Sequence, residues 1–184
     1  MRLESRRLIL RELSDADYES VHRFGSDPET VRFMDWGPNT PDDTRNFLKA
    51  AQAAARALLR TEYELAVTLR DSGELIGSCG IRVKSTQNRS ADFGYCVHRT
   101  FWGQGYATEA AAALIRFGFA TLKLHRIWAT CAPDNAASAR VLEKSGLKLE
   151  GRMRENVWVK GRWRDSLLYS ILEPEWKSTD ISAG

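Results

Sequence analysis

Two glycines placed just before a helix are the residues of this sequence best suited to bind a charged ligand. Residues 100–105 read Thr-Phe-Trp-Gly-Gln-Gly, and an alanine-rich helical pattern follows over residues 107–122. The first backbone N–H groups of a helix have no intrahelical partners, and the helix dipole is positive at that end. Gly103 and Gly105 would let the backbone approach a phosphate closely. The segment therefore predicts an anion site built from main-chain donors.

The residues around this loop exclude two common nucleotide-binding motifs. The phosphate loop of nucleotide hydrolases requires Gly-Lys followed by Ser or Thr, whereas Gly105 is followed by Tyr106. The dinucleotide-binding fingerprint requires three glycines and a later acidic residue on a second strand, and the segment does not fit it. Without a further motif, the two glycines are equally consistent with a tight turn between a strand and a helix.

A second motif lies about 30 residues downstream and also follows a strand pattern. Residues 135–147 read Asn-Ala-Ala-Ser-Ala-Arg-Val-Leu-Glu-Lys-Ser-Gly-Leu. Together the two segments resemble the Gcn5-related N-acetyltransferase (GNAT) superfamily. Residues 102–107 resemble its pyrophosphate-binding loop, and the Asn-x-x-Ser helix ending in Glu-Lys-x-Gly-Leu resembles its next motif.

Motifs near the two ends of the chain indicate which branch of the superfamily it resembles. The opening Leu3-x4-Leu8-Ile9-Leu10-Arg11 and the closing Gly161-x-Trp163-x-Asp165-x3-Tyr169 look like the RimJ/RimL-like branch, whose founding members acetylate protein N-termini. The resemblance implies an α+β fold with a mixed, mostly antiparallel central sheet, helices on both faces and a splayed strand pair. It implies a single N-acetyltransferase domain over residues 1–184, with a core at about 3–172 and a short C-terminal tail.

The resemblance also implies acetyl-CoA as the cosubstrate and no metal. The pyrophosphate would lie on the amides of residues 104–108, and the pantetheine would pair like an extra strand with residues 95–97. Asn135 would contact the pantetheine arm or brace the splay, and a plain helix cap is its alternative role. The implied binding residues are Tyr95, Cys96, Val97, Gly103, Gln104, Gly105, Tyr106, Ala107, Thr108 and Asn135.

One position departs from the superfamily pattern in a way that affects the leaving group. Many members carry a tyrosine that protonates the departing CoA thiolate, and Leu142 occupies that position here. Leucine cannot donate a proton, so Ser138 in the preceding turn becomes the candidate that hydrogen-bonds the sulfur. Its alternative interpretation is an ordinary polar residue in the first turn of a helix.

No single carboxylate stands out as the general base. Asp92 and Glu150 are the two candidates, acting directly or through water, because superfamily members place bases on the corresponding strands. His98 is a further candidate, since its pKa suits proton transfer near neutral pH. Glu109 is expected to offset the dipole of its helix. Asp165 is expected to pair with a neighbouring arginine, namely Arg152, Arg154 or Arg162.

The absence of an obvious strong base favours acceptor amines of low pKa. An α-amino group has a pKa of about 7.7 to 8.0 and lysine one of about 10.4, so deprotonating lysine at pH 7 costs roughly 3.5 kcal/mol more. The expected acceptor is a protein N-terminal α-amine, ribosomal or other, or a small-molecule amine that attacks the thioester directly. A non-catalytic acyl-CoA sensor and a nucleic-acid binder are the alternatives.

Composition and charge limit the remaining functional classes. The chain has 184 residues, 43% hydrophobic and 28% charged, which predicts one globular domain, monomeric or homodimeric. It has no long apolar run and no secretory signal at its start, so a cytoplasmic protein without a membrane partner is expected. A net charge of +3 does not favour nucleic acid, although residues 140–164 carry an excess of five positive charges. Three cysteines, expected to be buried free thiols, are Cys79, Cys96 and Cys131.

The elements that must position these residues follow from hydrophobic periodicity and turn residues. Strands are predicted at residues 3–13, 63–69, 74–83, 91–98, 126–132, 147–157 and 164–172. Helices are predicted after Ser14-Asp15, from Asp27-Pro28, from Asp42-Asp43, and over residues 107–122 and 136–145. Residues 71–73 predict a hairpin turn, and Gly146 predicts the end of the last helix.

Overall fold

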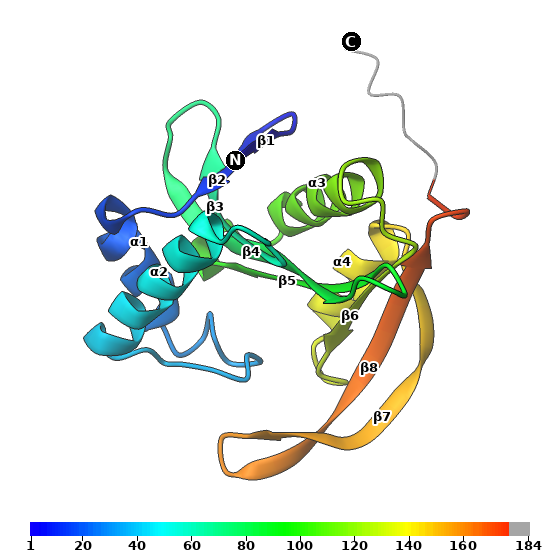
Figure 1. Cartoon of the computed structure of the whole chain (residues 1–184). Coiled ribbons are helices and arrows are strands. Elements are labelled where there is room, and N and C mark those ends of the chain that lie inside the picture. The colour runs from blue at the N-terminus through cyan, green and yellow to red at the C-terminus, as the bar shows by residue number, and fades with distance from the viewer. Residues whose placement is uncertain (177–184) are drawn as a thin grey trace.

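The computed structural model describes residues 1–176, and an eight-stranded sheet forms its centre (Figure 1). The strand order is β1-β2-β3-β4-β5-β6-β8-β7, and every neighbouring pair is antiparallel except β5 with β6. The strands are β1 (Arg2–Glu4), β2 (Leu8–Glu12), β3 (Glu62–Leu69), β4 (Leu75–Ser85), β5 (Ser90–Val97), β6 (Arg126–Cys131), β7 (Lys148–Val159) and β8 (Arg162–Leu172).

Helices cover both faces of this sheet. The helices α1 (Tyr18–Gly25) and α2 (Pro41–Arg56) pack on one face, and α3 (Tyr106–Ala120) and α4 (Ala136–Lys144) pack on the other. Strand alternation explains the two apolar layers: Leu65 and Val67 lie in the cluster with α3, whereas Ala66 lies in the cluster with α1 and α2. The predicted α+β architecture with helices on both faces is confirmed.

Strands β5 and β6 pair only at their beginnings. The parallel register joins residues 90–92 to residues 126–128 and then stops, although β5 continues to Val97 and β6 to Cys131. The expected splay is therefore present. Its open end lies beside the segments that lead into α3 and α4, so the sheet itself places the two sequence motifs around one gap.

Local chemistry sets the ends of the helices near this gap. The Asn135 side chain accepts a hydrogen bond from the Ser138 amide at 3.1 Å and caps α4. Gly146 ends the same helix with a φ of +88°, as its position in the sequence predicted. Thr40 and Asp43 form a capping box at the start of α2, where Pro41 occupies the first turn.

Two predicted elements differ from the structure. The single strand expected over residues 3–13 is a hairpin of β1 and β2, because the turn between them is held by Glu109 of α3 through the Ser5 hydroxyl and the Arg7 amide. The helix expected from Asp27-Pro28 is a series of turns. Its backbone carbonyls at Val31 and Phe33 accept side-chain hydrogen bonds from another part of the chain, and backbone bonds such as Met34 N–H to the Val31 carbonyl at 3.0 Å close single turns.

That other part of the chain is the long β7–β8 hairpin, which extends beyond the rest of the sheet (Figure 1). Lys160 donates to the Val31 carbonyl at 2.8 Å, and Arg164 donates to the Phe33 carbonyl at 2.6 Å. The hairpin thereby holds the segment between α1 and α2 in place. The expected C-terminal tail lies partly outside the described residues. Within residues 1–176, no helix combines the length and apolar character needed to cross a membrane.

Candidate active site

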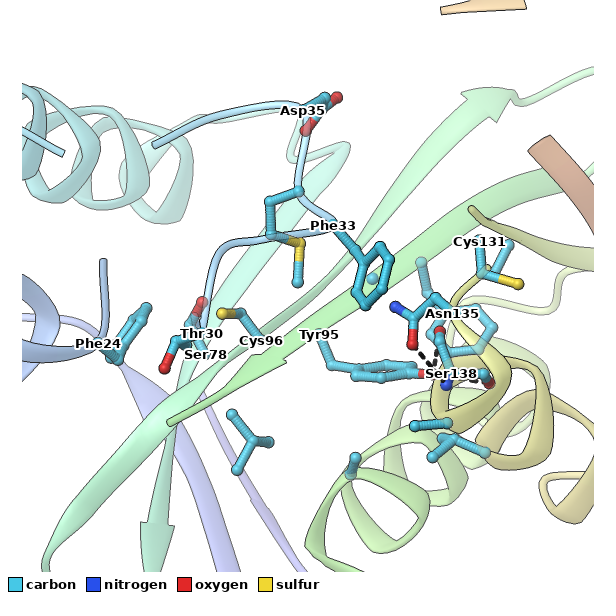
Figure 2. Close-up of a pocket in the computed structure, with 18 of the residues that line it drawn as sticks. Phe24, Thr30, Phe33, Asp35, Ser78, Tyr95, Cys96, Cys131, Asn135 and Ser138 are labelled. Carbon is cyan, nitrogen blue, oxygen red and sulfur yellow. Dashed lines mark hydrogen bonds between the residues drawn. The ribbon is translucent and has the colours of Figure 1, made fainter. Parts of the chain in front are cut away.

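A cavity of about 950 Å³ opens where β5 and β6 separate. Its walls come from the glycine loop before α3, the start of α4, the exposed ends of β5 and β6, and the segment between α1 and α2. Figure 2 shows Tyr95, Asn135 and Ser138 gathered on one side of it and Phe24, Thr30, Ser78 and Cys96 on the other. The cavity is large enough for a small-molecule ligand.

The glycine loop presents unpaired backbone donors to this cavity. Gly103 and Gly105 have φ values of +75° and +82°, and Gly105 is the N-terminal cap of α3. The Glu109 amide donates to the Gly105 carbonyl at 3.1 Å, so the amides of residues 106–108 precede the first intrahelical bond. A Cβ added at Gly103 would meet no atom within 4 Å, which shows that the backbone there is open to a ligand.

Most of the predicted loop residues line the cavity, with one exception. Gly103, Gly105 and residues 106–108 belong to its wall. Gln104 does not, because its side-chain amide turns back to the Thr100 carbonyl at 3.3 Å. The structure therefore directs the Gln104 side chain toward the loop itself.

Arg7 braces this loop from the β1–β2 turn. Its guanidinium donates to the Gln104 carbonyl at 3.0 Å, pairs with Glu109 at 2.8 Å and lies 4.5 Å from the centre of the Tyr106 ring. Burial would raise the pKa of Glu109, but hydrogen bonds from Arg7 and Ser5 hold it below its ordinary value. Glu109 thus holds the β1–β2 turn through Ser5 and Arg7, in addition to lying near the positive end of the helix dipole. No local sequence pattern predicts the contact of Arg7 with Gln104 and Glu109, because Arg7 is far from the loop in sequence.

A tyrosine and a serine meet across the splay. The Tyr95 hydroxyl lies 2.9 Å from the Ser138 Oγ, and Ser138 belongs to the α4 turn that Asn135 caps. Burial raises the pKa of Tyr95 well above its ordinary value, against a smaller opposing effect of the Ser138 hydrogen bond. Tyr95 therefore stays protonated at neutral pH. The sequence predicted only its main chain as a ligand-binding group, and its hydroxyl is a functional candidate that the sequence analysis missed.

The neighbouring residues of β5 are less available than expected. The Val97 carbonyl accepts a hydrogen bond from the Trp102 indole at 2.6 Å. The Cys96 thiol is buried in the apolar layer with α1 and α2, and burial raises its pKa to about 12. All three cysteines are free and buried, which confirms that prediction.

The two carboxylates predicted as bases have different surroundings. Asp92 lines the cavity, where it pairs with Arg82 at 3.4 Å and Lys84 at 3.6 Å. Glu150 is not among the lining residues. Hydrogen bonds from Arg126 at 2.6 Å and then from Ser170 lower its pKa to about 2. The geometry therefore brings Asp92, and not Glu150, to the cavity that Ser138 lines.

Three other titratable residues have clear positions. His98 lies at the end of β5 outside the cavity wall, its Nδ1 has no hydrogen-bond partner among the described residues, and burial lowers its pKa. Asp165 pairs with Arg152 at 2.6 Å, as expected. Glu64 of β3 faces the cavity and was not predicted. Its sequence signal is an acidic residue inside the otherwise apolar strand pattern Tyr-Glu-Leu-Ala-Val.

Comparison with known proteins identifies the family. The sequence profile of the acetyltransferase (GNAT) domain matches residues 7–148. The uncharacterized N-acetyltransferase YnaD of Bacillus subtilis is 31% identical over 176 residues, which covers 96% of this chain and 99% of that protein. An acetyltransferase (GNAT family) from Bacillus anthracis superposes with a TM-score of 0.83 at 32% identity, covering 95% of this chain and 99% of its own.

A structure with bound ligand is also similar to this chain. Mycobacterium smegmatis RimJ in complex with CoA-disulfide superposes with a TM-score of 0.80 at 29% identity. The alignment covers 91% of this chain and 83% of the RimJ chain.

Proposed function

This chain belongs to the GNAT family of N-acetyltransferases, and from that premise we propose that it moves the acetyl group of acetyl-CoA to a primary amine by direct attack. The observation that supports this most is the single cavity that joins the glycine loop of α3 to the Tyr95–Ser138 pair in the splay. An anion site and a set of hydroxyl donors at opposite parts of one cavity suit a long substrate with a phosphate end and a reactive thioester end.

The glycine loop is the proposed pyrophosphate site. The amides of residues 106–108 would donate to phosphate oxygens, and the open backbone at Gly103 leaves room for them. Arg140 and Lys144 of α4 line the same cavity and add positive charge, in line with the basic excess of residues 140–164. The CoA-disulfide in the M. smegmatis RimJ structure supports this choice of cosubstrate.

The backbone of residues 95–97 and the Asn135 amide are the proposed contacts of the pantetheine arm. On its β4 side β5 is paired up to Val97, but on its β6 side the pairing printed for the described residues ends at Asp92. The main-chain groups on that side would pair with an extended ligand. The Val97 carbonyl already accepts a hydrogen bond from the Trp102 indole, so a bond from the pantetheine would be its second. Asn135 holds its cap bond to Ser138 through Oδ1, which leaves its amide nitrogen available.

Ser138 is the proposed partner of the leaving thiolate. Its hydroxyl can donate to sulfur while the protonated Tyr95 donates to Ser138, so the pair supplies the hydrogen bond that Leu142 cannot make. Such a bond strengthens as negative charge develops on sulfur and therefore lowers the barrier. Because Ser138 has a poor pKa for an acid, its proposed role is to stabilise the thiolate by a hydrogen bond and not to give up its proton.

The acceptor is proposed to be an amine of low pKa, with protein N-terminal α-amines foremost, as in the RimJ/RimL-like branch. At pH 7 the α-amine is easier to deprotonate than lysine by roughly 3.5 kcal/mol. A short peptide with a free N-terminus and no lysine should therefore show a higher kcat/KM than the same peptide blocked at its N-terminus and carrying one lysine. Faster acetylation of the lysine peptide would contradict this preference.

Thiol release from acetyl-CoA tests the proposed function as a whole. The panel contains peptides with free N-termini, spermidine and an aminoglycoside, each compared with a blank without amine. We expect at least one amine to raise thiol release above the blank and to yield an acetylated product by mass spectrometry. Acetyl-CoA binding by calorimetry without acceleration by any of these amines would instead support the sensor alternative.

A further inference from the structure

Three residues on neighbouring strands form a row on the sheet face beneath the segment between α1 and α2. Glu64 of β3 pairs in register with Gly80 of β4, and Gly80 pairs with Gly94 of β5. A glycine inside a strand often marks a place where a ligand or another chain segment approaches the backbone closely. Here two such glycines lie side by side between Glu64 and the edge of the splay.

The Glu64 side chain bends across the first of these glycines. A Cβ added at Gly80 would collide with a carboxylate oxygen of Glu64. At Gly94, in contrast, an added Cβ would meet only the Arg82 guanidinium, at 3.8 Å, so the surface of β5 is open there. Strands lie about 4.8 Å apart, which places the carboxylate about one strand spacing from β5. That distance accommodates one ammonium group above Gly94.

The position of Gly94 connects this open space to the thioester end of the cavity. Gly94 immediately precedes Tyr95, whose hydroxyl bonds Ser138, the proposed partner of the thiolate. Gly94, Tyr95 and Glu64 all line the same cavity. An amine held between Glu64 and Gly94 would therefore lie beside the strand along which the pantetheine arm is proposed to lie.

The charges around Glu64 determine how well it can bind a cation. Burial raises the pKa of Glu64, while the Ser78 hydroxyl and the positive charge of Arg82 oppose this effect. Arg82 is already paired with Asp92, and within residues 1–176 no basic side chain forms an ion pair with Glu64. Glu64 is half-buried, and Arg82 acts on it only beyond ion-pair distance, so a positively charged ligand in direct contact with Glu64 would be stabilised.

The other side chains above the row are mostly apolar. The segment between α1 and α2, together with α2 itself, contributes a wall of large apolar and aromatic residues, namely Phe33, Met34, Trp36 and Phe47. The acidic groups on the same wall are Asp35 and Asp43, and Asp43 is engaged by Thr40. An ammonium group with an apolar or aromatic substituent complements this combination of the Glu64 carboxylate and an apolar roof.

We propose that Glu64 binds the ammonium group of the acceptor and then accepts its proton, and that the apolar roof favours primary amines, peptide N-termini included, whose substituent is apolar or aromatic. This inference rests on the proposed acetyl transfer. One proton passes from the ammonium to the Glu64 carboxylate, and the freed nitrogen lone pair forms a bond to the acetyl carbon. The carbon–sulfur bond breaks, its electron pair leaves on sulfur, and the second amine proton ends on the thiolate. Glu64 returns its proton to solvent.

Binding of 2-phenylethylamine to the protein saturated with CoA tests the anchoring role without any turnover. Glu64→Gln keeps the shape of the side chain and removes its charge, and Glu62→Gln is the matched control, because Glu62 is an exposed carboxylate two residues earlier on β3. By calorimetry we expect Glu64→Gln to weaken 2-phenylethylamine at least tenfold, Glu62→Gln to leave it unchanged, and neither change to affect CoA. Equal affinity in the wild-type protein and Glu64→Gln, or no binding to the wild-type protein, would overturn the proposal.

Kinetics with 2-phenylethylamine test the proton-accepting role. Loss of a general base typically costs 10²- to 10⁴-fold, and we expect Glu64→Gln to lower kcat/KM for the amine by this factor with an unchanged KM for acetyl-CoA. In the wild-type protein the rate should fall at acid pH as Glu64 becomes protonated, and this limb should vanish in Glu64→Gln. Arg82 and Glu62 are the charged groups that act on Glu64, and Asp92, Asp35 and Asp43 line the same cavity. An unchanged rate and profile would refute the role.

Gly94→Ala adds a methyl group at a position where the folded protein has space for it. The added methyl contacts only the end of the flexible Arg82 side chain, yet it occupies the space assigned to the ammonium. We expect a raised KM for 2-phenylethylamine with unchanged thermal stability and CoA affinity. If the wild-type protein binds acetyl-CoA and acetylates no amine, the proposed function fails, whereas the calorimetry with CoA still decides whether Glu64 binds ammonium.

Discussion

At the scale of single residues, the proposed mechanism assigns hydroxyl groups to the leaving thiolate and a carboxylate to the attacking amine. Tyr95 and Ser138 lie on the side of the sheet that α3 and α4 cover, whereas Glu64 lies on the side that α1 and α2 cover. The splay connects these sides. With the proposed proton acceptor and thiolate partner on opposite faces, the amine would approach the carbonyl carbon from one side and the thiolate would depart toward the other.

The hydroxyl pair can be tested by removing one oxygen. Tyr95→Phe keeps the buried ring and deletes the donor to Ser138, so we expect kcat to fall about tenfold, which corresponds to about 1.4 kcal/mol. Acetyl-CoA affinity should change little, because the interaction strengthens only as charge builds on sulfur. Ser138→Ala should have an effect of similar size, and the double variant should be no worse than the stronger single one. Additive losses would show that the two groups act separately.

Glu150 should affect stability and leave catalysis intact. Its pKa of about 2, lowered by Arg126 and Ser170, lies below the ordinary value, so its contribution to stability is present at neutral pH. That contribution should disappear as pH falls from about 5 toward 2. The Glu150 side chain is 37% exposed, which limits the contribution to about 1 kcal/mol or less. Thermal melts of Glu150→Gln should show a lower Tm at pH 7 and a smaller difference in acid, and a 10²-fold loss of kcat would instead identify Glu150 as the base.

At the scale of elements, the start of α3 is held by a turn near the N-terminus of the chain. The β1–β2 turn places Arg7 against the Gln104 carbonyl and Glu109, so the loop conformation does not depend on the glycines alone. Glycine supplies the positive φ angles, and Arg7 fixes the loop relative to the helix. A site built from backbone amides requires such bracing, because its donors must stay aligned before the ligand arrives.

The glycine loop predicts a specific loss of cosubstrate binding. Gly105 has a φ of +82°, and a Cβ there would lie 3.4 Å from Arg7, so Gly105→Ala should strain the cap and displace the brace. We expect acetyl-CoA to bind at least tenfold more weakly by calorimetry, or about 1.4 kcal/mol. Gly73→Ala is the matched control, because Gly73 has a φ of +73° in the remote β3–β4 turn. Similar binding losses in both variants would mean that strain alone lowers affinity.

At the scale of the whole molecule, the β7–β8 hairpin acts as a support for the acceptor side of the cavity. Its turn lies far along the chain from the segment between α1 and α2, yet it holds two carbonyls of that segment through Lys160 and Arg164. The family profile ends at residue 148, before most of this hairpin. The segment between α1 and α2 therefore lies inside the matched range, whereas most of the hairpin that holds it lies outside.

Loosening this support should affect the acceptor and spare acetyl-CoA. Lys160→Met removes the donor to the Val31 carbonyl. Arg162→Met at the start of β8 is the control, because among the described residues Arg162 has the same charge and makes no hydrogen bond to this segment. We expect Lys160→Met to raise the KM for 2-phenylethylamine several-fold with little change in the KM for acetyl-CoA. Equal effects of both variants on the amine would argue that positive charge near the turn, and not the hydrogen bond, is responsible.

The sequence by itself determined the features that depend on neighbouring residues. Glycines at positive φ before α3, the Asn135 cap, the end of α4 at Gly146 and the alternation that buries the three cysteines all arise from local backbone and hydropathy preferences. The family motifs are made of the same local features, and this is why the fold and the loop could be predicted. The strand over residues 3–13 and the helix at Asp27 were wrong because distant partners, Glu109 and the β7–β8 hairpin, decide the local conformation.

Only the tertiary structure decided which distant side chains meet. Tyr95 reaches Ser138 because β5 and β6 separate after three paired residues, and Glu64 reaches the cavity because the β3–β4–β5 register sets Gly80 and Gly94 beside it. A shift of one residue in that register would turn every side chain of the strand to the other face. Register depends on the packing of the whole sheet between its helices. The position of the carboxylate that faces the amine is therefore a property of the folded sheet.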